Sequence, residues 1–259
     1  MDTIVDWERD TPQWLEICAI AGNCGENRAF SGNFLWPIYG PLVATLPEDQ
    51  SFVIGQIGQS LDGRVATPTG HSHYINGPAA LVHLHRLRAL VDAVVVGVGT
   101  VVADDPQLTV RRAAKAPGRP QPARVIIDPQ GRMSSAAKCL ANDGARRIVV
   151  GAPPKVAGVE HISLPASRAG FIAGDVIAAL RGLGLKRLLI EGGPATLSRF
   201  LGAGCLDRLH VMTAPMIIGS GPAGAQLPVI DTLEKALRPH VSVHALPGGD
   251  MLFDCAFSR

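Results

Sequence analysis

The chain has 259 residues, of which 47% are hydrophobic and 18% are charged, with a formal net charge of +2. This composition is typical of a folded globular protein, and the small net charge disfavours nucleic-acid binding through a broad basic surface. No apolar run approaches the roughly 18 residues that a membrane span needs, and the acidic start has no apolar signal core. The five cysteines have no zinc-ligand spacing. We therefore expect a soluble, cytoplasmic protein with no metal, no nucleic-acid partner and no membrane contact.

Residues 1–48 hold all three tryptophans and show no clean hydrophobic period. We treat them as an N-terminal extension of unknown role, and residues 49–259 as the main domain. Trp7, Trp14 and Ile17 are spaced to share one apolar helix face. That face is expected to pack on the main domain or on a partner subunit.

From residue 52 onward, short β-branched runs alternate with helical or glycine-rich stretches. Strands are expected at 52–58, 93–98, 124–128, 147–151, 187–191 and 209–218. Helices are expected at 78–91, 173–182 and 195–203, the first of them beginning at Pro78. The alternation predicts a mostly parallel sheet covered by helices, and the pattern at 240–257 predicts a closing antiparallel hairpin.

Three turns at the carboxyl ends of these strands suit ligand binding, because ligands of open α/β sheets collect at that edge. They are Ser60-Leu61-Asp62-Gly63-Arg64, Gly97-Val98-Gly99-Thr100 and Glu191-Gly192-Gly193-Pro194-Ala195-Thr196. The third is the stronger phosphate signal, since a Gly-Gly turn before a helix exposes amides to an anion, and it is equally consistent with a tight connection. The Gly-x-Gly-x-x-Gly fingerprint of a Rossmann domain is absent.

Two kinds of titratable side chain remain to be interpreted. Glu191 ends an apolar strand, where a carboxylate is rare unless it binds a polar ligand, transfers a proton or caps a helix. The four histidines at 71, 73, 83 and 85 have no acidic or cysteine partner at metal-binding spacing. We expect them to be surface or hydrogen-bonding histidines.

Taken in order, these segments resemble the reductase domain of the bacterial bifunctional riboflavin biosynthesis deaminase-reductase, over about residues 52–259. The matching stretches are 60–64, 74–78, 85–89, 96–111, 124–128 and 190–194, and the most specific is the Asp-Asp-Pro-x-Leu-Thr-Val-Arg run that ends at Arg111. The resemblance implies a dihydrofolate-reductase-like three-layer α/β fold, with a mostly parallel central sheet and an antiparallel C-terminal hairpin. It also implies NADPH as hydride donor, reduction of a phosphoribosylaminopyrimidine to its ribitylamino product, and a homodimer.

The resemblance, carried over position by position, gives residues three roles. Glu191 is the expected catalytic residue. The cofactor would be held by Gly58, Tyr74, Thr100, Asp104, Gly193, Pro194, Ala195, Thr196, Leu197, Ser198 and Arg199. The substrate would be held by Ser72, Arg88, Leu108, Arg111 and Glu191. Arg88 and Arg111 would clamp the sugar phosphate through forked, charge-assisted hydrogen bonds.

The sequence departs from the family at Gln56, which replaces a lysine, at Tyr74, which replaces a frequent tryptophan, and at Pro129, which replaces a frequent serine. The zinc signature of the deaminase half is absent, so we expect another chain to deaminate. Two alternatives stay open: a pterin or dihydrofolate reductase of the same fold, and a non-catalytic nucleotide-binding paralogue. Arg88 with Arg111 disfavours the first, and Glu191 with the cofactor run disfavours the second.

Overall fold

The computed structural model of the chain describes residues 10–22, 32–73, 75–164 and 170–258. Within them, one sheet has the strand order β5-β4-β3-β2-β6-β1-β7-β9-β8. The strands are β1 (Phe52–Ser60), β2 (Ala93–Gly97), β3 (Ala123–Asp128), β4 (Arg147–Gly151), β5 (Glu160–Ile162), β6 (Arg187–Glu191), β7 (Arg208–Ala214), β8 (His240–Ala245) and β9 (Met251–Ala256). Pairing is parallel from β5 to β7 and antiparallel at β7–β9 and β9–β8. The expected parallel sheet with a C-terminal hairpin is confirmed.

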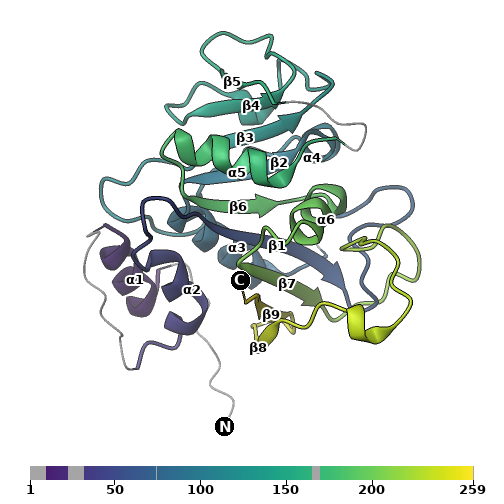
Figure 1. Ribbon diagram of the computed structural model, residues 1–259. Helices are drawn as coiled ribbons and strands as arrows, with labels where there is room; N and C mark the ends of the chain where they lie inside the picture. Colours follow the sequence, from purple (N-terminus) through teal and green to yellow (C-terminus); the bar gives the residue numbers. More distant parts are fainter. Residues whose placement is uncertain (1–9, 23–31, 74, 165–169, 259) are drawn as a thin grey trace.

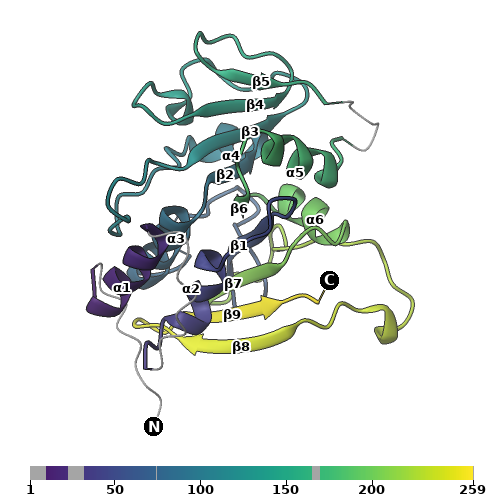
Figure 2. The ribbon, with the colours of Figure 1, turned by 60° about the vertical axis from the view of Figure 1, so that its left-hand side comes forward.

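Helices cover both faces of this sheet (Figures 1 and 2). They are α1 (Pro12–Gly22), α2 (Trp36–Val43), α3 (Pro78–Leu90), α4 (Val98–Asp104), α5 (Ala173–Gly182) and α6 (Pro194–Gly202), with short 3-10 turns at Lys138–Leu140 and Leu233–Lys235. Figure 2 shows α5 and α6 over one face and α3, with α1 and α2, over the other. Strand β2, which is buried on both faces, is accordingly a continuous apolar run.

Strand periodicity determines which face each side chain joins. Successive residues of a strand point to opposite faces. On β6, Leu188 and Ile190 belong to the apolar cluster under α5 and α6, whereas Leu189 belongs to the cluster under α3. Glu191, the next residue after Ile190, therefore falls on the α3 side of the sheet.

Three elements differ from the sequence prediction. β7 ends at Ala214 instead of residue 218, because Pro215 follows and has no amide to donate to the sheet. The three-residue edge strand β5 was too short and too exposed to show a pattern. The residues after Gly97, expected as a turn, form the short helix α4, which is capped at its C-terminus by Asp105 in a left-handed conformation.

The N-terminal extension contributes two helices that share the α3-side core. Trp14 and Ile17 are fully buried in that cluster, which confirms the predicted apolar face for these two residues. Trp7 lies outside the described residues. Within the part of the chain that the structure describes, no helix has the length and apolarity to span a bilayer, and no three His, Cys, Asp or Glu side chains gather in a way that could hold a metal.

Candidate active site

Two glycine turns meet at the carboxyl edge of the sheet, where α4 follows β2 and α6 follows β6. The Gly193 amide donates to the Thr100 hydroxyl over 2.8 Å. A Cβ at Gly97 would lie 2.2 Å from Thr196 Oγ1, and one at Gly192 would lie 2.7 Å from Thr100 Oγ1. Gly192 also has φ of +91°, a conformation that favours glycine. The glycines therefore let the starts of α4 and α6 approach each other closely.

Residues 193–199, the predicted cofactor run, divide into two sets. The Leu197 side chain packs where a Cβ of Gly55 would lie, and the buried Ser198 hydroxyl accepts from the Gln226 amide over 2.8 Å. These two side chains are therefore used within the fold. Pro194 begins α6, and Ala195 and Arg199 are exposed. Asp104, also predicted for the cofactor, is exposed at the end of α4.

Close packing surrounds Gly58, the remaining described residue of the predicted cofactor set. A Cβ there would lie 2.1 Å from Asn76 Oδ1. Asn76 in turn donates to Asp250 Oδ1 over 3.2 Å, and the Gly77 amide donates to Asp250 Oδ2 over 2.6 Å. The turn of the C-terminal hairpin thus holds the start of α3, an arrangement that sequence reasoning missed. Ser72 is half-buried nearby in sequence, and Tyr74 lies outside the described residues.

Asp62 ties together two loops beside this edge. Its carboxylate accepts from the Ser60 hydroxyl over 2.6 Å and from the amides of Ile218 and Gly219 over 3.0 and 2.7 Å. The Ser60 hydrogen bond, followed by those amides, lowers the pKa of Asp62 to about 2. The turn predicted at Asp62-Gly63 is confirmed, with Gly63 at φ of +77°.

Glu191 forms a buried, forked ion pair with Arg88. Arg88 Nε donates to Oε1 and Nη2 donates to Oε2, both over 2.6 Å, and the two residues are 6% and 5% exposed. Arg88 Nη1 donates to the Thr109 carbonyl over 3.0 Å. The two-arginine phosphate clamp expected from the sequence is therefore not the observed geometry, because Arg88 is directed at Glu191. A contact between Arg88 and the substrate stays a prediction.

Arg111 is an exposed cation of this region. Its Nη1 donates to Gln107 Oε1 over 2.5 Å and to Thr109 Oγ1 over 2.8 Å, so both of these partners are neutral. Partial burial, then the charges of Arg88 and Arg112, lower its pKa. Arg111 lines a cavity of about 360 Å³ whose other charged lining residues are Lys138 and the Arg124–Asp143 ion pair. An uncompensated positive charge beside a cavity suits an anionic ligand.

Backbone strain occurs in the same segment. Leu108, predicted to contact the substrate, has φ of +56° and is 2% exposed. A left-handed conformation costs a non-glycine residue on the order of 1 kcal/mol. The buried side chain supplies the packing that offsets this cost, so Leu108 anchors the segment that carries Thr109 and Arg111.

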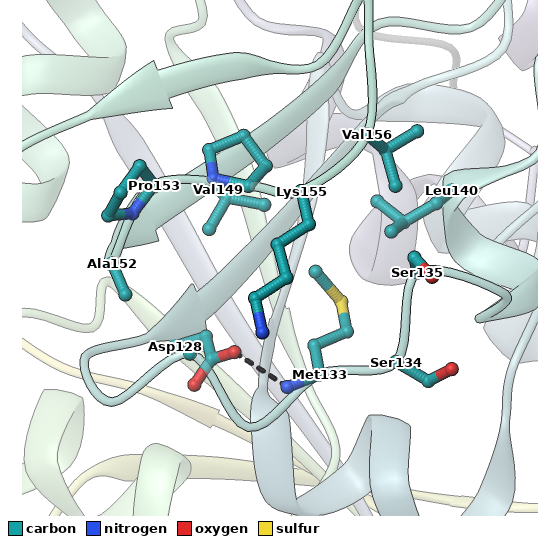
Figure 3. Close-up of a pocket in the computed structure, with 12 residues that line it drawn as sticks. Asp128, Met133, Ser134, Ser135, Leu140, Val149, Ala152, Pro153, Lys155 and Val156 are labelled. Atoms are coloured by element: carbon teal, nitrogen blue, oxygen red, sulfur yellow. Dashed lines mark hydrogen bonds between the residues drawn. The ribbon is translucent and has the colours of Figure 1, made fainter.

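A small pocket lies at the carboxyl ends of β3 and β4 (Figure 3). Asp128 closes its floor by accepting from the amides of Arg132 and Met133 over 3.0 and 2.9 Å. The Lys155 side chain extends across the pocket toward Asp128 (Figure 3). The space measures about 20 Å³, enough for a water-sized group. Sequence reasoning missed Lys155, because the lysine follows β4 by several loop residues.

Gln56 lies between two ionisable residues on the α3 side. It pairs in register with Glu191 on β6 and with His210 on β7. The His210 ring lies 3.1 Å from His83, which in turn lies 2.7 Å from the Tyr39 hydroxyl. Burial, then the neighbouring His210, lowers the pKa of His83 well below its usual value. A polar row thus crosses the buried sheet from Glu191 to the N-terminal helices.

The four histidines at 71, 73, 83 and 85 divide into a buried pair and an exposed pair. His83 is fully buried and bonded to Tyr39 and His210, and the 3%-exposed His85 accepts from the Arg111 amide over 3.0 Å. The expectation of surface or hydrogen-bonding histidines is therefore confirmed for both through their hydrogen bonds. His71 and His73 are exposed, as expected.

Comparison with known proteins gives consistent matches. The RibD C-terminal domain profile matches residues 51–241. The chain is 33% identical over 220 residues to the 2,5-diamino-6-ribosylamino-4(3H)-pyrimidinone 5′-phosphate reductase of Methanothermobacter thermautotrophicus, covering 78% of this chain and 96% of that protein. It is 35% identical over 200 residues to riboflavin biosynthesis protein RibD of Aquifex aeolicus, covering 74% of this chain and 54% of that protein. The chain thus spans about half the length of that RibD relative.

A solved structure of Acinetobacter baumannii RibD superposes with a TM-score of 0.73 and 28% identity, covering 82% of this chain and 59% of that one. Together with the sheet order, this match confirms the expected dihydrofolate-reductase-like fold.

Proposed function

Since the chain belongs to the RibD C-terminal domain family, we propose that it is an NADPH-dependent reductase of riboflavin biosynthesis. Its substrate would be a phosphoribosylaminopyrimidine, and its product the ribitylamino compound. The observation that carries this proposal is the joint presence of a glycine-lined cradle at the carboxyl edge of the sheet, a buried Glu191–Arg88 pair whose glutamate directly precedes Gly192, and an exposed Arg111.

The glycine cradle supports a dinucleotide cofactor. Gly97, Gly192 and Gly193 leave no room for side chains between α4 and α6, so backbone would face a phosphate directly. The Thr100 hydroxyl accepts from the Gly193 amide and keeps its own proton to donate. The remaining predicted cofactor residues, among them Gly58 and Asp104, would extend this contact along the sheet edge. When bound, NADPH supplies the hydride.

The pocket of Figure 3 supports a preference for NADPH over NADH. It lies at the ends of β3 and β4, on the edge that holds the glycine cradle, and Lys155 places an ammonium group there beside the Asp128 carboxylate. Its volume of about 20 Å³ is too small for a base and suits only a small group at its mouth. We propose that Lys155 attracts the additional phosphate that distinguishes NADPH.

The substrate side of the proposal depends on Arg111 and Glu191. Arg111, whose observed partners are neutral, would bind the sugar phosphate by charge-assisted hydrogen bonds. Glu191 would accept hydrogen bonds from the pyrimidine or the opened sugar while Arg88 keeps the carboxylate oriented. Gln56, which lies beside Glu191, orients polar groups but cannot donate a proton as an acid.

A homodimer would cover apolar surface that the monomer exposes. Val229 and Leu233 are 99% and 76% exposed in the loop that follows β7. Val241 and Val243 are 43% and 50% exposed on β8, an edge strand of the sheet. We propose a cytoplasmic homodimer, and a monomer mass in sedimentation equilibrium would contradict this part of the proposal.

The test of the function is oxidation of NADPH by purified protein, followed by its absorbance. The substrates are the diaminopyrimidinone ribosylamine phosphate, its deaminated uracil counterpart, and dihydrofolate. Turnover of either pyrimidine supports the proposal and shows whether deamination comes first. Turnover of dihydrofolate alone would make the protein a pterin-type reductase, and tight NADPH binding without turnover would make it a non-catalytic paralogue.

A further inference from the structure

We propose that helix α1 is a positioning element of the substrate site. It fixes the backbone of residues 108–116, named here the Arg111 segment, and thereby sets the affinity for the substrate phosphate. Trp14 is the residue that transmits this effect. The inference rests on the proposed function, because it assigns the phosphate to Arg111.

Direct contacts join α1 to the Arg111 segment at Ala114. The Trp14 indole Nε1 donates to the Ala114 carbonyl over 3.2 Å, and Cys18 Sγ lies 3.6 Å from the same oxygen. The Ala114 amide donates to Asp10 Oδ1 over 2.8 Å. Both backbone polar groups of Ala114, three residues after Arg111, are therefore held by the N-terminal extension.

Apolar packing supports these hydrogen bonds. Ala113 and Ala116 are buried in the cluster that contains Trp14, Ile17 and Cys18. The tryptophan is fully buried, so its N–H must be satisfied inside the protein. The Ala114 carbonyl satisfies it.

The rest of the segment is held from the main domain, residue by residue. The Thr109 carbonyl accepts from Arg88 over 3.0 Å, and the Val110 amide donates to Gln121 Oε1 over 2.8 Å. The Arg111 amide donates to His85 over 3.0 Å. Beyond Arg111, Ala114 is held by the N-terminal extension, and the Ala116 carbonyl accepts from the Arg119 amide over 3.0 Å. Without the Ala114 contacts, the first anchor after Arg111 would be five residues further along the chain instead of three.

Trp14 is also coupled to α3 itself. The guanidinium of Arg86 lies 5.1 Å from the Trp14 ring and 5.9 Å from the Tyr39 ring, and Arg86 is fully buried. Cation–π contacts of this kind are strengthened by burial. Arg86 lies beside His85, the residue that holds the Arg111 amide. The indole therefore reaches the Arg111 segment by two routes, through Ala114 and through α3.

A fixed loop binds an anion more tightly than a mobile one, because the cost of ordering it has been met on folding. Arg111 is exposed, so the position of its side chain depends on the backbone anchors on either side of it, the buried Leu108 before it and Ala114 after it. Loosening the Ala114 end is expected to weaken phosphate binding without altering the glycine cradle, which is built from other elements.

Trp14→Phe tests this inference, because it removes the indole N–H while keeping a buried aromatic ring. We expect kcat/KM for the phosphorylated pyrimidine to fall roughly 3- to 10-fold, the range set by one lost hydrogen bond. The value for the unphosphorylated ribosylamine and the KM for NADPH should stay within about twofold. The matched control is Trp36→Phe, the same change on α2, where the ring packs over Gly40.

Binding of ribose 5-phosphate, measured by calorimetry, separates this inference from the proposed function. Weaker ribose 5-phosphate binding by Trp14→Phe, but not by Trp36→Phe, supports the positioning role even if wild-type protein turns over neither pyrimidine. Equal losses on phosphorylated and unphosphorylated substrates, equal losses in both variants, or no ribose 5-phosphate binding by wild-type protein would each overturn it.

Discussion

Replacing Glu191 by glutamine is expected to destabilise the protein as well as slow it. The sequence alone predicts near-normal folding for this variant with a large fall in turnover. In the structure, however, both carboxylate oxygens accept from the 6%-exposed Arg88 over 2.6 Å. A glutamine keeps one acceptor but directs its amide hydrogens at a guanidinium donor, which leaves a buried charge without a counter-ion. Breaking a buried pair in this way costs about 3 kcal/mol of unfolding free energy.

Urea unfolding of wild-type protein, Glu191→Gln, Arg88→Met and the double variant measures this cost. The double variant removes both charges, so it should be more stable than the sum of the single losses implies. The chain offers a matched control in Glu160→Gln. Glu160 makes the same forked contact with Arg146 over 2.9 and 2.7 Å, but both side chains are 42% exposed. An exposed pair contributes less than about 1 kcal/mol.

Equal destabilisation by Glu191→Gln and Glu160→Gln would refute the reasoning, since burial would then make no difference. Turnover separates the two roles of Glu191. We expect the kcat of Glu191→Gln to fall by at least about tenfold under conditions in which the variant is fully folded, because the carboxylate would face the reacting sugar. A destabilised variant with normal kcat would show that Glu191 serves the fold alone.

Three further substitutions test the site and the core. Arg111→Ala should raise the KM for the phosphorylated pyrimidine at least about tenfold with little change for NADPH, and equal losses would contradict the phosphate assignment. Gly192→Ala should weaken NADPH binding, measured by fluorescence, far more than Gly184→Ala, whose φ of +81° is similarly unfavourable but whose surroundings are open. His83 is neutral when folded and binds a proton near pH 6.5 when unfolded, so stability should fall as pH drops below that value, by up to about 1.4 kcal/mol per pH unit. Urea midpoints of His83→Asn between about pH 5 and 7 should fall less steeply than those of wild-type protein, and identical slopes would exclude His83 as the cause.

The sequence predicts the features that depend on residues close together in the chain, namely strands, helix starts and turns. Apolar alternation located six strands, and Pro78 marked the start of α3, since these signals arise from local backbone geometry. The glycine-containing turns predicted after β2 and β6 lie together in the structure, with Thr100 bonded to Gly193, because parallel strands end at one edge of the sheet. What the sequence could not supply were pairings across the chain. Trp14 and Ala114 are separated by 100 positions, and Arg88 and Glu191 by 103. No local pattern indicates that Arg88 pairs with the Glu191 carboxylate.

Helix α3 shows why such pairings matter for this fold. From its sequence, the polar run from His83 to Arg88 has the composition of a solvated face. In the structure it is buried, because α3 packs between the sheet and the N-terminal helices: His83 and Arg88 contact β7 and β6, and Arg86 contacts α1. Burial of polar groups is tolerated only when each has a partner.

The partners of these α3 residues come from five different elements. His83 meets Tyr39 of α2 and His210 of β7, His85 meets the Arg111 segment, Arg86 meets Trp14 of α1, and Arg88 meets Glu191 of β6. Each partner is fixed only when its own element has docked, so the polar residues of α3 require all five to be in place together. The N-terminal extension is consequently linked to the substrate side of the site through one helix. A substitution that alters the packing of the extension is therefore expected to alter the position of the substrate-side residues, and the reverse.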